Sequence, residues 1–115
     1  MLVTKVDSVL PYTAAKHHDV TAFRLQGFDA SDLKAFWVGL SLYAPGGRAE
    51  RDASGTEKVY VVVDGEITVI TDEGEAVLGA LDSVYLAPGE ARAVENRSGA
   101  VASILVLMEY PKQAG

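Results

Sequence analysis

The stretch GGRAERDASGTEKVYVVVDGEITV, residues 46–69, decides the fold. Near its end, the pair Asp64-Gly65 separates two runs of β-forming residues, at 61–63 and 67–69. An Asp-Gly pair flanked in this way is the strongest short-range indication of a β-hairpin. The stretch therefore predicts two antiparallel strands joined at Gly65.

Short β-rich runs lie on both sides of this stretch and alternate with turn-forming residues. Pro, Gly, Asp or Asn recurs about every 8 to 12 residues, and no helical period is present, a pattern typical of an all-β sandwich or barrel. Further strands are expected at 2–10, 20–25, 36–43, 75–78, 83–86, 91–95 and 100–110, with a connection at 13–19, at most one helical turn in 28–34, and a turn at 44–47.

Length and composition fit a single domain. The chain has 115 residues, of which 49% are apolar and 23% charged, and it contains no cysteine. We expect N-terminal strands and a connection over 1–35 and a barrel core over 36–110. No run of about 18 apolar residues and no secretory signal is present, so we expect a cytoplasmic location and no membrane partner. A net charge of −6 without a basic stripe argues against nucleic acid as a partner.

The spacing within residues 46–69 resembles the first signature of the cupin superfamily, G-x5-H-x-H-x3,4-E-x6-G. Gly46 and Gly65 occupy its two ends, and the positions of the metal ligands hold Asp52, Ser54 and Lys58. The resemblance implies a single-domain, cupin-type jelly-roll barrel with an interior pocket, and frequent dimerisation.

The second cupin signature, G-x5-P-x-G-x2-H-x3-N, fits the stretch LDSVYLAPGEARAVEN. Gly89 and Asn96 match the signature, whereas Leu81 and Ala87 replace its first glycine and its proline. The position of its histidine holds Arg92. The family's metal is bound by three histidines and a carboxylate, and all four matching positions differ in this chain.

The residues at these four positions argue against a bound metal. Asp52 could still ligate an ion, but the neutral hydroxyl of Ser54 is a poor ligand, and protonated Lys58 and Arg92 offer no lone pair. A divalent ion about 4 Å from one ammonium is opposed by about 8 kcal/mol at an effective dielectric near 20. We therefore predict a protein without a metal or other cofactor.

Strand alternation predicts that five polar side chains project together into the barrel. Two cations beside a carboxylate, a hydroxyl and a phenol suit a small anion, because arginine presents a bidentate fork and lysine a point charge. The chain is therefore predicted to bind a small carboxylate or oxyanion metabolite, with isomerase or lyase chemistry left open. The candidate catalytic residues are Lys58, as a general base or imine-forming amine with a lowered pKa, and Asp52; the candidate ligand-binding residues are Ser54, Tyr60 and Arg92.

Two other interpretations remain open. In the first, ion pairs such as Asp52–Lys58 and a Glu–Arg92 pair fill an inactive barrel, and the chain is a structural or interaction dimer. In the second, His17, Glu50 and Asp52 form an unorthodox metal site. Because adjacent residues of an extended segment point to opposite sides, a solvated connection is the expected place for His17 and His18, although one of them could reach the pocket.

A homodimer is expected from the apolar character of two strands on both faces. The runs at 58–63 and 100–108 are mostly apolar on both sides, whereas a closed barrel needs only one buried face. A second subunit could cover the other face, and so could the N-terminal strands of the same chain. Trp37 and Tyr43 are expected in the core, since aromatic side chains contribute most to core burial.

Overall fold

The computed structural model describes residues 1–111, which form strands joined by turns and one short 3-10 turn. None of its helical segments is long or apolar enough to cross a membrane. The all-β prediction is confirmed. The elements are η1 (Val6–Ser8), β1 (His17–Gln26), β2 (Trp37–Asp52), β3 (Lys58–Asp64), β4 (Ile67–Thr71), β5 (Gly74–Leu78), β6 (Ser83–Leu86), β7 (Arg92–Glu95) and β8 (Ala102–Met108).

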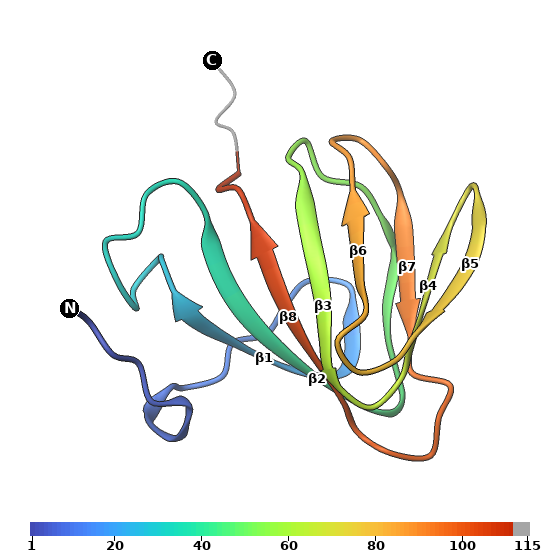
Figure 1. The fold of residues 1–115 in the computed structure, drawn as a ribbon, viewed down its shortest axis with the longest axis horizontal. Coiled ribbons are helices and arrows are strands. Elements are labelled where there is room, and N and C mark those ends of the chain that lie inside the picture. Colours follow the sequence, from blue (N-terminus) through green and yellow to red (C-terminus); the bar gives the residue numbers. More distant parts are fainter. Residues whose placement is uncertain (112–115) are drawn as a thin grey trace.

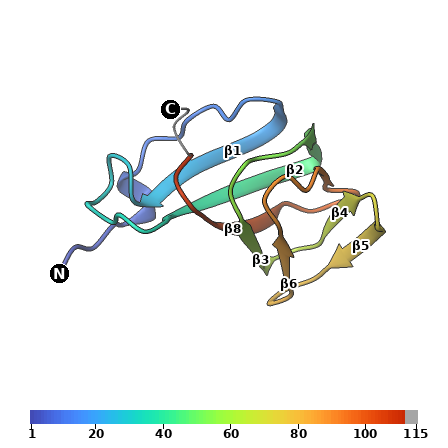
Figure 2. The same ribbon diagram turned by 90° about the horizontal axis from the view of Figure 1, so that it is seen from above.

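The strands form one sheet, in the order β5-β4-β7-β2-β8-β3-β6, and β1 adds to β2 (Figure 1). All pairs are antiparallel. β2 is the longest strand and changes partner along its length: Trp37 to Tyr43 pair with β8, and Arg48 to Asp52 pair with β7. The sheet therefore curls on itself through β2 into a nearly closed barrel, seen from above in Figure 2.

Side chains of alternate residues fill the interior of the barrel. In β3 the residues at 58, 60 and 62 are buried, and those between them are less so. The same alternation places the even-numbered residues of β8 inside. One cluster results, which contains Tyr43, Ala49, Tyr60, Val62, Ile67, Val69, Leu86, Val94, Ala102 and Ile104.

The hairpin predicted at Asp64-Gly65 is wrong. β3 pairs with β6 and β8, whereas β4 pairs with β5 and β7, so the two strands do not pair with each other. Gly65 has a φ of +84°, and its backbone lies against Val101 and Ala102. The turn therefore carries the chain from one side of the barrel to the other instead of folding it back on itself.

Two other predicted boundaries are also wrong. The segment 2–10 forms no strand, and most of its apolar side chains are exposed, with Leu10 at 87%. Its alternation is loose, and only Tyr12, just after Pro11, makes an isolated bridge to β1. The turn predicted at 44–47 is part of β2, because this is where the strand passes from β8 to β7 and its bend needs the positive φ of Gly46.

Replacing Gly65 by alanine is expected to destabilise the fold by about 2–4 kcal/mol, since strain at positive φ adds to overpacking. A Cβ atom at this position would lie 2.7 Å from the carbonyl oxygen of Val101 and 2.8 Å from Cα of Ala102. Gly55→Ala is the matched control, because nothing lies within 4 Å of a Cβ there. Urea unfolding of the two variants checks this prediction, and equal midpoints would contradict it.

Candidate functional site

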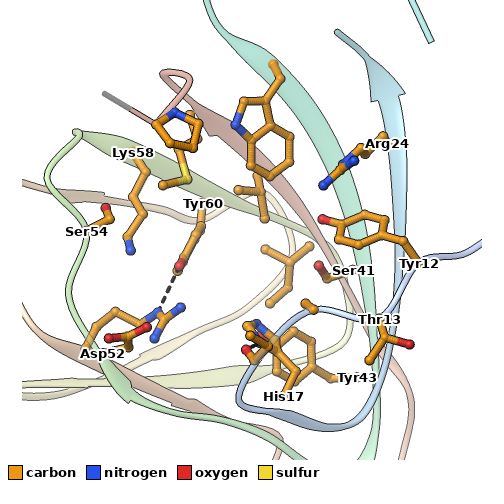
Figure 3. A pocket seen from close by; sticks show the side chains of 18 of the residues that line it. Tyr12, Thr13, His17, Arg24, Ser41, Tyr43, Asp52, Ser54, Lys58 and Tyr60 are labelled. Atoms are coloured by element: carbon orange, nitrogen blue, oxygen red, sulfur yellow. Dashed lines mark hydrogen bonds between the residues drawn. The ribbon is translucent and has the colours of Figure 1, made fainter. Parts of the chain in front are cut away.

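The barrel encloses a cavity of about 450 Å³. Strands β1, β2, β3, β7 and β8 line it, together with residues 12–15 of the segment before β1 (Figure 3). A volume in this range suits a small organic ligand. The barrel is therefore not filled by its own side chains, in contrast to the first of the two alternative interpretations.

All five side chains predicted to meet in the barrel line this cavity, namely Asp52, Ser54, Lys58, Tyr60 and Arg92. Lys58 and Tyr60 are two residues apart on β3 and so share its inner face. Asp52, at the end of β2, is opposite Arg92, the first residue of β7. Alternation within β3 placed Lys58 and Tyr60 together, and the spacing of the cupin signatures supplied the other three positions.

Arg92 is held in place by two hydrogen bonds. Its Nε donates to the hydroxyl of Tyr60 over 2.9 Å, and its Nη1 donates to the carbonyl oxygen of Glu50 over 3.0 Å. The residue is only 8% exposed. No carboxylate lies within 4.0 Å of it among residues 1–111, so the predicted Glu–Arg92 ion pair is wrong. A fixed cation thus faces the cavity.

Lys58 is the second cation of the cavity and is 5% exposed. The pKa of its ammonium is lowered from 10.5 to about 8, chiefly by burial and then by the neighbouring Arg92, while Asp52 opposes the shift. Within residues 1–111 its Nζ makes no hydrogen bond, and it lies 5.9 Å from the ring centroid of Tyr60. At neutral pH this group is a protonated and unusually acidic amine.

Asp52 pairs with a lysine other than the predicted one. Its carboxylate lies 3.4 Å from Nζ of Lys16, and the side chain is half exposed. A hydrogen bond from the backbone of Ala53, followed by that from Lys16, lowers the pKa of this carboxyl. The predicted Asp52–Lys58 ion pair is therefore wrong. Asp52 stays ionised at the cavity wall, where Figure 3 shows it on the same side of the cavity as Ser54 and Lys58.

The two histidines do point to opposite sides, but they do not lie in a solvated connection. β1 begins at His17, and this ring lines the cavity 6.4 Å from that of Tyr43. Burial lowers the pKa of His17, against a hydrogen bond to Ala15 that raises it. His18 instead contacts the carboxylate of Glu50 at 2.7 Å, outside the cavity lining. The alternative in which one histidine reaches the pocket is the correct one.

Several lining residues were missed by the sequence reasoning. Trp37 was assigned to the core, whereas its side chain lines the cavity. Arg24 was not considered, although it is two residues after the buried Ala22 on β1 and so shares its face. Tyr12 lies in a segment without a strand pattern, and no signal in the sequence places it.

The donor set does not fit a divalent metal. Among residues 1–111 the lining holds one carboxylate, Asp52, and the hydroxyl of Ser54 already donates to the carbonyl oxygen of Thr56 over 3.0 Å. Lys58 and Arg92 add two cations. In the part of the chain that the structure describes, no three His, Cys, Asp or Glu side chains converge on one point, so His17, Glu50 and Asp52 form no such site.

The family model that matches the chain, Cupin domain, covers residues 39–108. The chain belongs to the cupin family. It is also 48% identical over 111 residues to the beta-D-galactosidase Rv1717 of Mycobacterium tuberculosis, with 96% of each chain covered.

Solved structures confirm the jelly-roll fold. The polyketide cyclase RemF from Streptomyces resistomycificus superposes with a TM-score of 0.86 at 16% identity, covering 95% of this cupin and 79% of the cyclase. A sugar phosphate isomerase of the cupin superfamily from Silicibacter pomeroyi gives a TM-score of 0.80 at 23% identity, covering 92% of this chain and 74% of the isomerase. At such identities the likeness concerns the fold alone.

Proposed function

We propose that this cupin hydrolyses a β-D-galactoside bound in the barrel cavity. The observation that carries the proposal is the relative named beta-D-galactosidase, which is 48% identical over nearly the full length of both chains. The cavity supports it, because aromatic rings lie beside hydroxyl and charged groups, as a polyhydroxylated ring requires.

Glycoside hydrolysis needs a group that protonates the leaving oxygen and a group that assists the attacking water. Many glycosidases use two carboxylates, but Asp52 is the one carboxylate among the described residues of the lining. In our proposal its ionised carboxylate takes a proton from water as the water oxygen bonds to the anomeric carbon. The Lys58 ammonium gives its proton to the departing glycosidic oxygen. Solvent then returns both residues to their starting protonation states.

Replacing Asp52 by asparagine is expected to lower kcat about a hundredfold, because the amide accepts no proton from water. Release of nitrophenol from 4-nitrophenyl β-D-galactoside measures this, with the α-anomer as substrate control. Asp72→Asn is the matched variant, since Asp72 lies outside the cavity and pairs with Arg51 on the surface. A wild-type chain that releases no nitrophenol, or an Asp52→Asn variant as active as the wild type, would refute the proposal.

A second candidate is binding of a small anionic metabolite without hydrolysis. The cations Lys58 and Arg92 favour it, because Asp52, the one lining carboxylate in the described part of the chain, already contacts Lys16. A thermal-shift series with citrate, phosphate and galacturonate separates the candidates: stabilisation by an anion that Arg92→Met abolishes and Arg48→Met preserves supports binding. Stabilisation by neutral galactose and none of the anions excludes it.

The predicted homodimer and cytoplasmic location stay predictions. Apolar side chains are exposed on the outside of the barrel, among them those of Val63 and Tyr85. Such a surface is compatible with a second subunit.

A further inference from the structure

We infer that the cavity has a second binding end, formed by Arg24, Trp37 and Tyr12, that takes an acidic group on the ligand. Lys58, Tyr60 and Arg92 form the first end. The inference rests on the proposed function, because it places the galactose ring at the first end, near Lys58, and the leaving group at the second.

Arg24 is a positioned cation that forms no ion pair with any of residues 1–111. Its Cζ lies 4.3 Å from the ring centroid of Tyr12 and 4.0 Å from that of Phe28, so two aromatic rings hold the guanidinium. No carboxylate lies within 4.0 Å of it in residues 1–111, although Asp29 lines the neighbouring cavity that Arg24 also borders. A held guanidinium of this kind suits a carboxylate, sulfate or phosphate.

Two buried hydrogen-bond donors at this end of the cavity have no acceptor among residues 1–111. Nε of Arg24 and Nε1 of Trp37 are buried and make no hydrogen bond among the described residues. Buried donors in proteins are nearly always bonded, and both of these residues line the cavity. An oxyanion of the ligand bound at this end would provide an acceptor that the described residues do not supply.

The absence of a side chain at Gly39 leaves room for the indole ring of Trp37. Gly39 is the third residue of β2, within the part that pairs with β1 and β8, where glycine weakens a strand, and a Cβ atom there would lie 2.7 Å from Cζ3 of Trp37. The ring of Trp37 thus occupies the space that a side chain at position 39 would fill. This packing presents the indole to the cavity.

The two ends lie on different strands of the barrel wall. Arg24 is opposite Gly39, Gly39 is opposite Val106, and Val106 is opposite Tyr60. Neighbouring strands are about 4.8 Å apart, so Arg24 and Tyr60 are separated by about 14 Å along the sheet. Figure 3 shows Arg24 across the cavity from Lys58. A ligand that reaches both ends is a galactoside whose leaving group carries a second ring and an acidic substituent.

The chain contains one tryptophan, so fluorescence reports on this end directly. Benzoate, which carries no sugar, is expected to change the emission of Trp37 in a saturable manner and to bind at least tenfold more weakly to Arg24→Met. Arg48→Met is the control, because Arg48 is exposed on β2 and outside the cavity lining. Arg24→Lys keeps the positive charge but loses the bidentate guanidinium. Its affinity for benzoate should lie between those of Arg24→Met and Arg48→Met. An unchanged emission, or equal affinity in Arg24→Met with an unchanged melting temperature, would overturn the inference.

A pair of substrates tests this end and the proposed function separately. The wild type should cleave 4-carboxyphenyl β-D-galactoside with a kcat/KM at least tenfold above that for phenyl β-D-galactoside, and Arg24→Met should abolish the difference. Equal rates on the two substrates would refute the second end and leave the galactosidase intact. If neither substrate is cleaved, the proposed function fails, and the benzoate titration alone decides on the second end.

Discussion

Replacing Lys58 by methionine is expected to lower kcat for the galactoside by about 10²–10⁴-fold, the usual contribution of general acid catalysis. The thioether cannot protonate the leaving oxygen but keeps most of the apolar volume of the lysine stem. Because burial and Arg92 lower the pKa of Lys58 to about 8, the wild-type rate should fall as pH rises through 8. It should also fall in acid, where Asp52 is protonated, with a pKa below its usual value.

The same substitution is expected to stabilise the folded chain at neutral pH. The folded pKa of Lys58, about 8, lies below its ordinary value of 10.5, so the unfolded chain binds more protons between these values and stability rises with pH there. Below pH 8 the ammonium is charged in both states and its burial costs the full penalty, on the order of 3 kcal/mol. Lys58→Met should therefore gain about 1–3 kcal/mol at pH 7 and lose this advantage as pH approaches 10.5.

Urea unfolding at pH 7 and pH 10, together with a pH–rate profile, checks both effects. Lys34→Met is the matched control, because the Lys34 side chain is exposed and outside the main cavity lining. Activity that rises above pH 8 would indicate that Lys58 acts as a base, the role that the sequence also allowed. A variant less stable than the wild type at pH 7 would show that the buried ammonium has a favourable contact.

How much of this structure could be predicted from the sequence depends on how far apart along the chain the interacting residues lie. Alternation within one strand is a local property, and it placed Lys58 and Tyr60 on one inner face. The glycine spacing that resembles the cupin signatures added Asp52, Ser54 and Arg92, which stand at positions where the family has metal ligands. Five side chains of the site could therefore be predicted without knowledge of which strands pair.

Strand pairing was the part that local patterns could not supply. Asp64-Gly65 is a hairpin signal by its residue types, yet the edges of β3 are taken by β6 and β8, so β4 joins β5 and β7 instead. The true hairpin lies at Thr71–Gly74, where the sequence predicts a turn. Packing across the barrel overrode the local preference.

The second end of the cavity was missed for a related reason. Arg24 faces inward because β1 adds to the edge of β2, and the guanidinium is tolerated there because the rings of Tyr12 and Phe28 enclose it. These contacts join segments that no periodic pattern connects. His17 entered the site in the same way, since β1 begins before the run of β-formers that predicted it.

Replacing Asn96 by alanine is expected to destabilise the fold by about 3 kcal/mol or more, since buried backbone groups lose their partners. The side chain is 1% exposed, and its Nδ2 donates to the carbonyl oxygens of Tyr43 and Ala100 over 2.9 and 2.8 Å. Its Oδ1 accepts from the backbone and the hydroxyl of Ser98 over 3.0 and 2.7 Å. One amide therefore ties β2 to the turn between β7 and β8.

Two variants separate the donor role of Asn96 from its acceptor role. Asn96→Asp keeps the acceptor but replaces the donor with a buried charge facing two carbonyl oxygens, so it should cost at least as much as alanine. Ser98→Ala removes only the hydroxyl partner and should cost about 1 kcal/mol. Urea unfolding of the three variants measures these differences, and an Asn96→Asp variant as stable as the wild type would refute the donor role. Because Tyr43 also lines the cavity, galactoside binding by any folded Asn96 variant should weaken as well.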